Sequence, residues 1–347
     1  MLRKKALSGK EFLEAFIAGV EVDCKLGLCA KIGPLQLGYI YTALIGTFGA
    51  AAASAKLMGL DGEGIAMFLG VAYSLTSGNA QQLVEGTLSK RLQAGRAAMN
   101  GVLSTLIASK EFTGAKEVFE GKFGFFNVYL RGKYDPKPID ELRVSYEIPY
   151  VSFKPYSCCR LTHTAIDATL KLKEKYNLKP DDIKKVLVGV NRQAYNANAQ
   201  PIEIKRKPRN IVDAQFSIPY VVACALIYGR GSLSDFTDEA IRREDVLKVA
   251  KLVEPYVDEE VESKYGRVIT PAKVKVILKD GTSYTEEVIH PLGEPKNPMS
   301  REILVDKFVD AAEYSGLLSK DKAKEIPEII LSVEELRDIR ELIKLVT

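Results

Sequence analysis

Several residue types that mark particular protein classes are scarce or absent from this chain. It contains no tryptophan and only two histidines, and none of its five cysteines forms a C-x-x-C pair. An odd number of cysteines without such a pair argues against a disulfide framework. With so few histidines, the chain also has few possible ligands for a zinc site. The formal net charge of +4 is too small a surplus for a nucleic-acid-binding surface. We therefore expect no metal and no nucleic-acid partner.

The motifs of several cofactor and hydrolase sites are missing as well. There is no G-x-x-x-x-G-K-[ST], H-E-x-x-H or G-x-S-x-G, and the run Gly62-Glu63-Gly64 continues without a third glycine. The chain therefore lacks the usual residues for nucleotide binding, metal-dependent hydrolysis and serine hydrolysis. Any chemistry has to come from Lys, Tyr, Asp, Glu, Cys and the two histidines, and we expect no cofactor.

Two uncharged stretches, residues 32–55 and 65–84, are long enough to raise the question of a membrane span. Both are rich in small residues, and the second contains Asn79, Gln81 and Gln82. This composition suits helices packed inside a large helical domain better than contact with lipid. At the N-terminus, acidic residues interrupt the place where the apolar core of a secretion signal would lie. We expect a cytoplasmic protein without a membrane partner.

The first part of the chain has helical periodicity. The length of 347 residues, the hydrophobic fraction of 46% and the mean hydropathy of −0.04 are typical of a globular chain with about two domains. Ser8 and Glu11 form a capping-box pattern at the start of the first helix. Further helical patterns cover residues 47–58, 62–77, 86–109 and 113–119. Residues 1 to about 145 are therefore predicted to be all-helical.

The pattern changes near Pro149, where strands begin to alternate with helices. The predicted strands are residues 151–153, 183–190 and 273–278, the last followed by an Asp280-Gly281 turn and a second alternating run to Ile289. The predicted helices are residues 164–176, one beginning near Asp213, one in the region 237–253, one at 300–315, and a last one capped by Ser332 and Glu335. This indicates an α+β domain with an antiparallel sheet, after which the C-terminal helices are expected to pack back on the first domain.

Four segments combine residues that packing alone would not require. They are residues 41–60 with the run Gly46-Thr47-Phe48-Gly49-Ala50-Ala51-Ala52, residues 85–98 with Ser89-Lys90-Arg91-Leu92-Gln93, residues 154–168 with Lys154-Pro155-Tyr156, Arg160 and His163, and Asp213-Ala214-Gln215-Phe216-Ser217-Ile218-Pro219-Tyr220. In this order they resemble the MmgE/PrpD family of 2-methylcitrate dehydratase-like and cis-aconitate decarboxylase-like enzymes.

The resemblance implies a fold that agrees with the periodicity. A large helical domain, residues 1–148 and 294–347, would carry an inserted α+β lid domain, residues 149–293, so that the chain is α+β overall. The family's chemistry would be that of a cofactor-independent lyase, such as a hydro-lyase, or an isomerase, acting on a small di- or tricarboxylate in a cleft between the domains of a homodimer. Matching positions nominate Lys90, His163 and Tyr220 as catalytic residues.

Elementary chemistry supports cations in such a site, because removing a proton next to a carboxylate builds negative charge on it. Lys90 and Arg96 lie in a segment of small residues, where a ligand can approach the backbone, and we add Arg91 as a further substrate-binding residue. The alternative is that these cations belong to a solvated helix end.

His163 precedes a predicted helix, and the basic Lys154 and Arg160 lie close to it in the sequence. This grouping favours carboxylate binding, with His163 as base, acid or anchor, over a structural histidine. Tyr220 follows Pro219 at the start of an apolar helix, where its hydroxyl either donates a proton in the cleft or is satisfied by a backbone partner in the core.

The chain departs from the family pattern in ways that bear on activity. Family members usually have a preceding helical region that supplies an acidic residue and a histidine, and Ile40 and Gln93 stand where relatives often have histidines. The alternatives are a truncated or non-catalytic carboxylate-binding member, a subunit whose N-terminal helices come from a separate polypeptide, a start codon further upstream, or a decarboxylase or epimerase of the same family. We expect the chain alone to bind a carboxylate weakly and to show little turnover.

Overall fold

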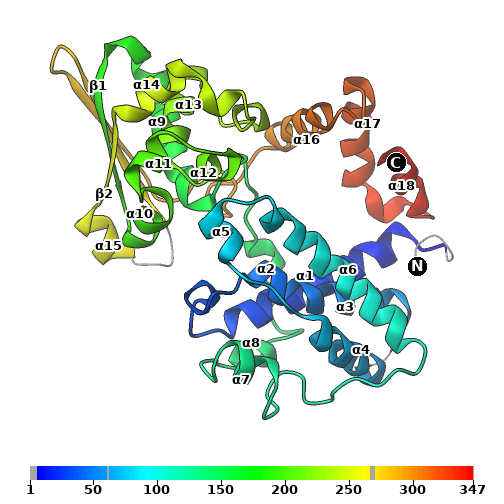
Figure 1. The fold of residues 1–347 in the computed structure, drawn as a ribbon. Helices are drawn as coiled ribbons and strands as arrows, with labels where there is room; N and C mark the ends of the chain where they lie inside the picture. Colours follow the sequence, from blue (N-terminus) through cyan, green and yellow to red (C-terminus); the bar gives the residue numbers. More distant parts are fainter. Residues whose placement is uncertain (1–5, 61, 266–269, 347) are drawn as a thin grey trace. The chain divides into compact units, whose positions relative to one another are not determined.

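The computed structural model describes residues 6–60, 62–265 and 270–346. The chain forms two compact units, one made of Met1–Tyr150 with Glu325–Thr347 and the other of Val151–Lys324 (Figure 1). The helical segment that ends at residue 324 is grouped with the second unit, whereas the sequence predicts a return to the helical domain at residue 294. The domain boundaries of the sequence analysis stay a prediction.

The first unit is helical. Its helices are α1 (Gly9–Leu28), α2 (Tyr41–Leu44), α3 (Gly46–Leu57), α4 (Gly62–Leu75), α5 (Gln81–Glu85), α6 (Ser89–Ala108), α7 (Phe125–Tyr129), α8 (Lys137–Asp140) and α18 (Arg340–Val346). Ser8 and Glu11 form the expected capping box at the start of α1, and the patterns at 47–58, 62–77 and 86–109 are confirmed as α3, α4 and α6. The predicted helix at 113–119 is wrong. Gly114 lies so close to α4 that a Cβ there would be 2.5 Å from the Val71 nitrogen, and this close packing is made by a loop.

Small residues let the helices of this unit approach one another. A Cβ on Gly19 of α1 would lie 2.7 Å from the Gly49 carbonyl oxygen of α3, and one on Gly101 of α6 would lie 2.4 Å from the Ala50 Cβ. The buried aromatic side chains of Phe48 (α3) and Phe125 (α7) pack edge to face. The uncharged stretch 32–55 therefore forms the centre of the helical unit.

The last part of the chain, residues 325–347, belongs to the helical unit, and its residues 333–335 contact α1. The predicted helix at 300–315, which was expected to pack there as well, is grouped with the second unit. The buried side chains of Leu7, Val333 and Ile339 form one apolar cluster. The last helix begins later than predicted, because Ser332 precedes only the short 3-10 helix η7 (Val333–Glu335), and α18 starts at Arg340.

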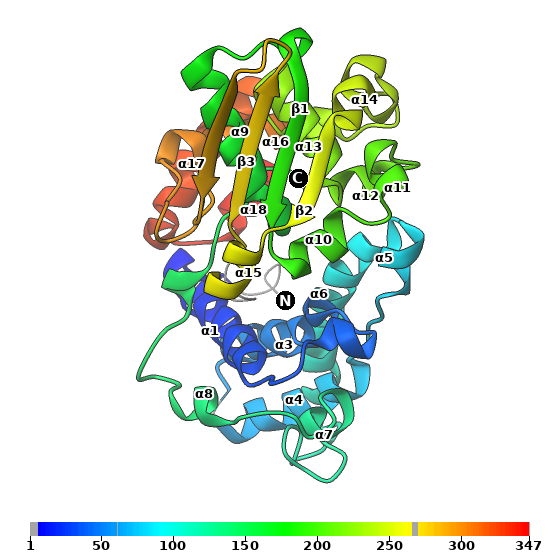
Figure 2. The same ribbon diagram turned by 90° about the vertical axis from the view of Figure 1, so that its left-hand side faces the viewer.

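The second unit contains a four-stranded sheet. Its strands are β1 (Ile183–Val190), β2 (Val253–Val257), β3 (Ala272–Leu278) and β4 (Ser283–Val288) in the order β2-β1-β3-β4 (Figure 2). The predicted strand 183–190 and the hairpin are confirmed, with Val188 opposite Val274 and Val274 opposite Glu286 in antiparallel register. The sheet is mixed rather than antiparallel throughout, because β2 pairs with β1 in parallel.

Two other expectations for this unit are corrected. The helix predicted over 237–253 ends at Lys251, and the chain continues as edge strand β2, which carries Pro255 as edge strands can. Residues 151–153 form no strand, and the Phe153 nitrogen donates to the Gly293 carbonyl oxygen.

Helices pack against the sheet of the second unit, and two of them, α9 and α13, pack on the sheet and on each other to form the main apolar core. The helices are α9 (His163–Tyr176), α10 (Arg192–Asn198), α11 (Ile202–Arg206), α12 (Ile211–Gln215), α13 (Ile218–Tyr228), α14 (Glu244–Lys251), α15 (Glu259–Tyr265) and α16 (Arg301–Ser315), followed by α17 (Lys320–Leu331), which crosses the boundary between the units. Across the described ranges 6–60, 62–265 and 270–346, no helix combines the length and apolar character that a membrane span requires.

Candidate functional site

A polar cavity of about 710 Å³ lies beside the first half of α6 in the helical unit. Its wall is formed mainly by α6, α5, the loop between α4 and α5, and two tyrosines. The lining residues are Tyr39, Ser77, Gly78, Asn79, Gln81, Gln82, Glu85, Thr87, Ser89, Leu92, Gln93, Arg96, Val128 and Tyr129. Cavities of this size with converging polar groups are the usual form of a small-molecule site.

Side chains of α6 hold the loop between α4 and α5. Because residues 76–79 form no regular structure, their carbonyl groups need other donors. Gln93, Arg96 and Asn100 lie one turn apart on α6, and each donates to a carbonyl oxygen at or near this loop. Gln93 Nε2 donates to the Asn79 carbonyl oxygen at 2.9 Å, and Asn100 Nδ2 donates to the Leu75 carbonyl oxygen at 2.8 Å. The Arg96 guanidinium donates to the Ser77 carbonyl oxygen.

Glycine is required where the loop crosses α2. A Cβ on Gly78 would lie 2.3 Å from the Ala43 Cβ and 3.1 Å from Gln93 Oε1. Gln93 Oε1 is buried and has no hydrogen-bond partner among the described residues. Gln93 therefore lines the cavity with a side-chain oxygen that the described residues leave without a hydrogen bond.

Arg96 supplies an uncompensated positive charge to this cavity. Its guanidinium donates to the hydroxyl and the carbonyl oxygen of Ser77, while its Nε is buried without a partner. None of the acidic side chains in the described ranges lies within ion-pair distance of it. An arginine in this state is suited to bind an anion, above all a planar carboxylate.

Two phenols complete the wall. Tyr39 and Tyr129 pack edge to face with ring centroids 5.3 Å apart. The Tyr129 hydroxyl donates to the Thr76 carbonyl oxygen at 2.9 Å, and burial raises the pKa of Tyr129. The Tyr39 hydroxyl makes no hydrogen bond within the described part of the chain, so it can donate to a ligand.

Of the three cations predicted on α6, Arg96 lines the cavity and the other two do not. Lys90 and Arg91 lie in the first turn of α6, where Lys90 is partly exposed and Arg91 is exposed. Their roles, and the convergence of Lys90 with His163 and Tyr220 on one site, stay predictions.

His163 begins α9 in the second unit and is fully buried. Neither ring nitrogen makes a hydrogen bond of normal geometry to a described residue, and the ring packs edge to face on Tyr156. Burial, and secondarily the positive charge of Arg160, lowers the pKa of His163 to about 3. The imidazole is therefore neutral at physiological pH.

The two cations predicted near His163 differ in their surroundings. Lys154 is exposed. Arg160 forms an ion pair with Glu294, which also contacts His290 Nδ1 at 2.8 Å. The charge of Arg160 is thus already balanced inside the unit.

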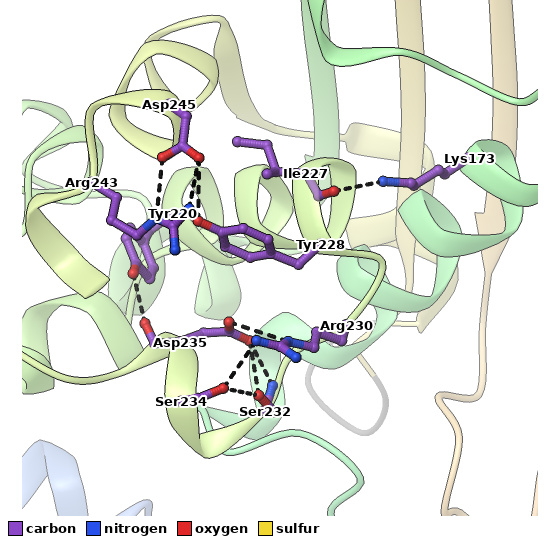
Figure 3. Close-up of polar contacts among 10 residues, drawn as sticks. All are labelled: Lys173, Tyr220, Ile227, Tyr228, Arg230, Ser232, Ser234, Asp235, Arg243 and Asp245. Carbon is purple, nitrogen blue, oxygen red and sulfur yellow. Dashed lines mark hydrogen bonds and ion pairs between the residues drawn. The ribbon is translucent and has the colours of Figure 1, made fainter. Parts of the chain in front are cut away.

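Tyr220 lies fully buried on α13, and its hydroxyl donates to the Asp235 carbonyl oxygen at 2.6 Å (Figure 3). Desolvation by burial raises the pKa of Tyr220. Beside it, the Asp235 carboxylate contacts Arg230 and accepts a hydrogen bond from the Ser232 nitrogen at 2.7 Å (Figure 3). This environment matches the core tyrosine that the sequence left open as the alternative to a proton donor.

Comparison with protein families identifies the chain. The profile of the MmgE/PrpD C-terminal domain matches residues 156–335, more than half of the chain, and the profile of the MmgE/PrpD N-terminal domain matches residues 2–137. The chain belongs to the MmgE/PrpD family. This confirms the family resemblance and, with the observed helices and sheet, the α+β fold class.

Curated members of the MmgE/PrpD family with related sequences carry two activities in their names. A cis-aconitate decarboxylase of Aspergillus terreus is 29% identical over 358 residues, covering 98% of this chain and 71% of that protein. The human cis-aconitate decarboxylase is 27% identical over 346 residues, covering 97% and 69%. The mitochondrial 2-methylcitrate dehydratase of Yarrowia lipolytica is 26% identical over 320 residues, covering 88% and 60%.

Most of the cavity wall in this MmgE/PrpD chain is not predicted from the sequence. The polar residues Asn79, Gln81 and Gln82 are a visible signal, since they interrupt an otherwise apolar stretch, although by themselves they argue only against a membrane span. Tyr39 and Tyr129 carry no local signal, because only folding brings them together. Within the described ranges, no group of three or more His, Cys, Asp or Glu side chains is arranged so that it could hold a metal ion.

Proposed function

We propose that this chain is a lyase-type member of its family that binds a small di- or tricarboxylate in the cavity beside α6. Arg96 is the observation that carries the proposal. It is a partly buried cation that lines the cavity, has an unpartnered Nε, and has no acidic partner among the described residues. The names of the relatives, which refer to cis-aconitate and 2-methylcitrate, support a polycarboxylate as the ligand.

The proposed chemistry is removal of a proton next to a substrate carboxylate. Arg96 would bind one carboxylate and offset the negative charge that develops as the proton leaves. Tyr39 would donate a hydrogen bond to the substrate or to the leaving group. Lys90 is proposed as a second cation. His163 stays a proposed site residue, and its lowered pKa means that it would act as a neutral hydrogen-bonding group and not as a positive charge. For Tyr220 the observations favour a structural role.

A carboxylate-binding protein without turnover is the second candidate. The described residues that line the cavity include no histidine, and their only carboxylate, Glu85, accepts a hydrogen bond from Gln81 at 2.7 Å. A binding protein needs only the cation and the donors, which are present.

Binding and turnover can be measured separately. Isothermal titration with citrate, cis-aconitate and 2-methylcitrate should detect binding of at least one, and Arg96→Gln should weaken it about 10- to 100-fold, because charge-assisted hydrogen bonds contribute about 1.5–3 kcal/mol. Lys110→Gln is the control, since it removes an exposed positive charge at the other end of α6, away from the cavity, and should leave affinity within about twofold.

Turnover is then followed by NMR of the same mixtures. Appearance of a dehydration or decarboxylation product supports the lyase, whereas binding without any product supports the second candidate. Affinity that is equal in wild type and Arg96→Gln would contradict both.

A further inference from the structure

A second cavity lies in the α+β unit, and all of its lining residues belong to that unit. Its volume is about 240 Å³. Its wall comes from the segment 155–157, the loop 229–233 that follows α13, the first turns of α16, and the leucines Leu170 and Leu292. No residue lines both this cavity and the cavity beside α6.

Buried contacts hold two of these segments in place. The Asp167 carboxylate, on α9, accepts hydrogen bonds from the Tyr156 hydroxyl and from the Leu292 nitrogen, the latter at 2.7 Å. Asp167 and Tyr156 are both buried. The loop 229–233 packs closely on the same tyrosine, since a Cβ added to Gly231 would lie 3.2 Å from Tyr156 Cδ1. The protein itself therefore fixes the wall around Tyr156, as is usual for a ligand site.

A second buried carboxylate orders the loop 229–233 and balances its positive charge. Asp235 accepts a hydrogen bond from the Ser232 nitrogen at 2.7 Å, and its carboxylate lies 3.6 Å from Arg230 Nε (Figure 3). The Arg230 guanidinium also donates to the Ser234 hydroxyl at 3.1 Å (Figure 3). Arg230 therefore has a counter-ion within the unit, as Arg160 has in Glu294.

Two polar residues of the wall are not engaged in this way. Lys307, on α16, forms no ion pair or hydrogen bond with a described residue. The Ser157 hydroxyl likewise makes no hydrogen bond within the described part of the chain, although the Ser157 carbonyl oxygen accepts one from Gln215 at 2.8 Å. An ammonium group and a hydroxyl without partners are donors that a carboxylate can accept from.

The rest of the wall is mainly apolar and limits the size and charge of a ligand. A cavity of about 150 Å³ can hold one benzene ring, so this one has room for a ring or a short branched chain with a single small polar group. Asp310, one turn after Lys307 on α16, adds a negative charge to the wall and disfavours a ligand with several carboxylates. The apolar lining side chains are Pro155, Tyr156, Leu170, Leu233, Leu292 and Ile303.

We propose that this cavity is a second ligand site, which binds a small monocarboxylate with an apolar body. Lys307 and Ser157 would bind the carboxylate, and the apolar body would lie against Tyr156 and the leucines. This ligand differs in class from the polycarboxylate proposed for the cavity beside α6. The inference does not depend on the proposed lyase activity.

Benzoate and benzamide are a matched pair of probes, because they have nearly the same shape and differ in charge. Isothermal titration of the full chain at pH 7 should detect benzoate binding, and benzamide should bind at least about 10-fold more weakly, because it lacks the charge that strengthens the hydrogen bonds. Lys307→Gln should weaken benzoate binding by about 10-fold as well. Absence of benzoate binding, or equal affinity for the two probes, would overturn the proposal.

Asp310→Asn should change the affinity in the opposite direction. It removes a negative charge from the wall and should strengthen benzoate binding about two- to fivefold. Damage to the fold does not raise affinity, so this variant separates an effect of charge from an effect of misfolding. Lys251→Gln, at an exposed residue of α14 that does not line the cavity, is the control and should bind benzoate within about twofold of wild type. Wild-type affinity in both Lys307→Gln and Asp310→Asn would contradict the proposed site.

Arg96→Gln separates the two cavities. It should leave benzoate affinity within about twofold of wild type while it weakens polycarboxylate binding, and Lys307→Gln should do the reverse. Loss of benzoate binding in Arg96→Gln would assign benzoate to the cavity beside α6 and overturn the second site. The proposed function and this inference can therefore fail independently of each other.

Discussion

Arg96 in the helical unit and Arg160 in the α+β unit were both predicted to bind substrate, and their surroundings differ in one respect that matters. Arg96 donates to uncharged groups of Ser77, so its charge faces a cavity without compensation. Arg160 forms an ion pair with Glu294. An arginine is available to a ligand only when the fold has not already supplied its counter-ion, and this cannot be read from the arginine's own position in the sequence.

The two units also differ in the buried titratable groups that they contain, Asp23 in the helical unit and His163 in the α+β unit. Asp23 on α1 accepts a hydrogen bond from the Gly49 nitrogen at 3.0 Å, yet burial raises its pKa to about 7. Burial lowers the pKa of His163 to about 3. Both groups are neutral over much of the range between these values, but they link the stability of their units to pH with opposite signs.

The largest expected effect is the acid sensitivity due to His163. Between about pH 6.5 and pH 3 the unfolded chain binds a proton at this residue and the folded chain does not, so the unfolding free energy falls as pH falls, by up to about 1.4 kcal/mol per pH unit. Denaturant titrations from pH 7 to pH 4 measure this slope. His163→Phe keeps a ring against Tyr156 and should remove the slope; an unchanged slope would show that other groups cause it.

Asp23 should act in the opposite direction. Between about pH 4 and pH 7 the folded chain retains a proton that the unfolded chain has lost, so this residue's contribution falls as pH rises, again by up to about 1.4 kcal/mol per pH unit. The difference in unfolding free energy between wild type and Asp23→Asn should therefore decrease over this range. Asparagine can still accept from the Gly49 nitrogen, so a pH-independent difference would contradict the raised pKa.

A smaller effect is expected from removing the counter-ion of Arg160. Glu294→Gln leaves a partly buried guanidinium uncompensated and should lower the unfolding free energy by about 1–2 kcal/mol, less than for a fully buried pair because both side chains keep some solvent contact. Chemical denaturation at pH 7 measures the loss. Glu302→Gln, at an acidic residue in the exposed first turn of α16, is the control and should change stability by less than about 0.5 kcal/mol.

Periodicity predicted the long elements well and the short or tightly packed ones poorly. The helices α1, α3, α4, α6 and α9 and the β3–β4 hairpin were recognisable because one face of each is apolar or small, or because a turn signal separates two strands. The loop at 113–119 was predicted as a helix because its composition is helical, while the decisive fact is the close approach of Gly114 to α4. The parallel pairing of β2 was missed because strand direction depends on the path of the chain, not on the strand's residues.

The sequence by itself determined the family and the α+β class, because ordered motifs and apolar periodicity can be recognised from neighbouring residues along the chain. It also predicted Arg96 as a substrate-binding cation, and that role stays a prediction. Only the tertiary structure decided which predicted groups are available. It placed Tyr39, Gln93 and Arg96 around one cavity and gave Arg160 and Tyr220 partners of their own. Burial and pairing are set by residues far away in the chain, and they determine whether a charge or a hydroxyl faces a ligand or the protein.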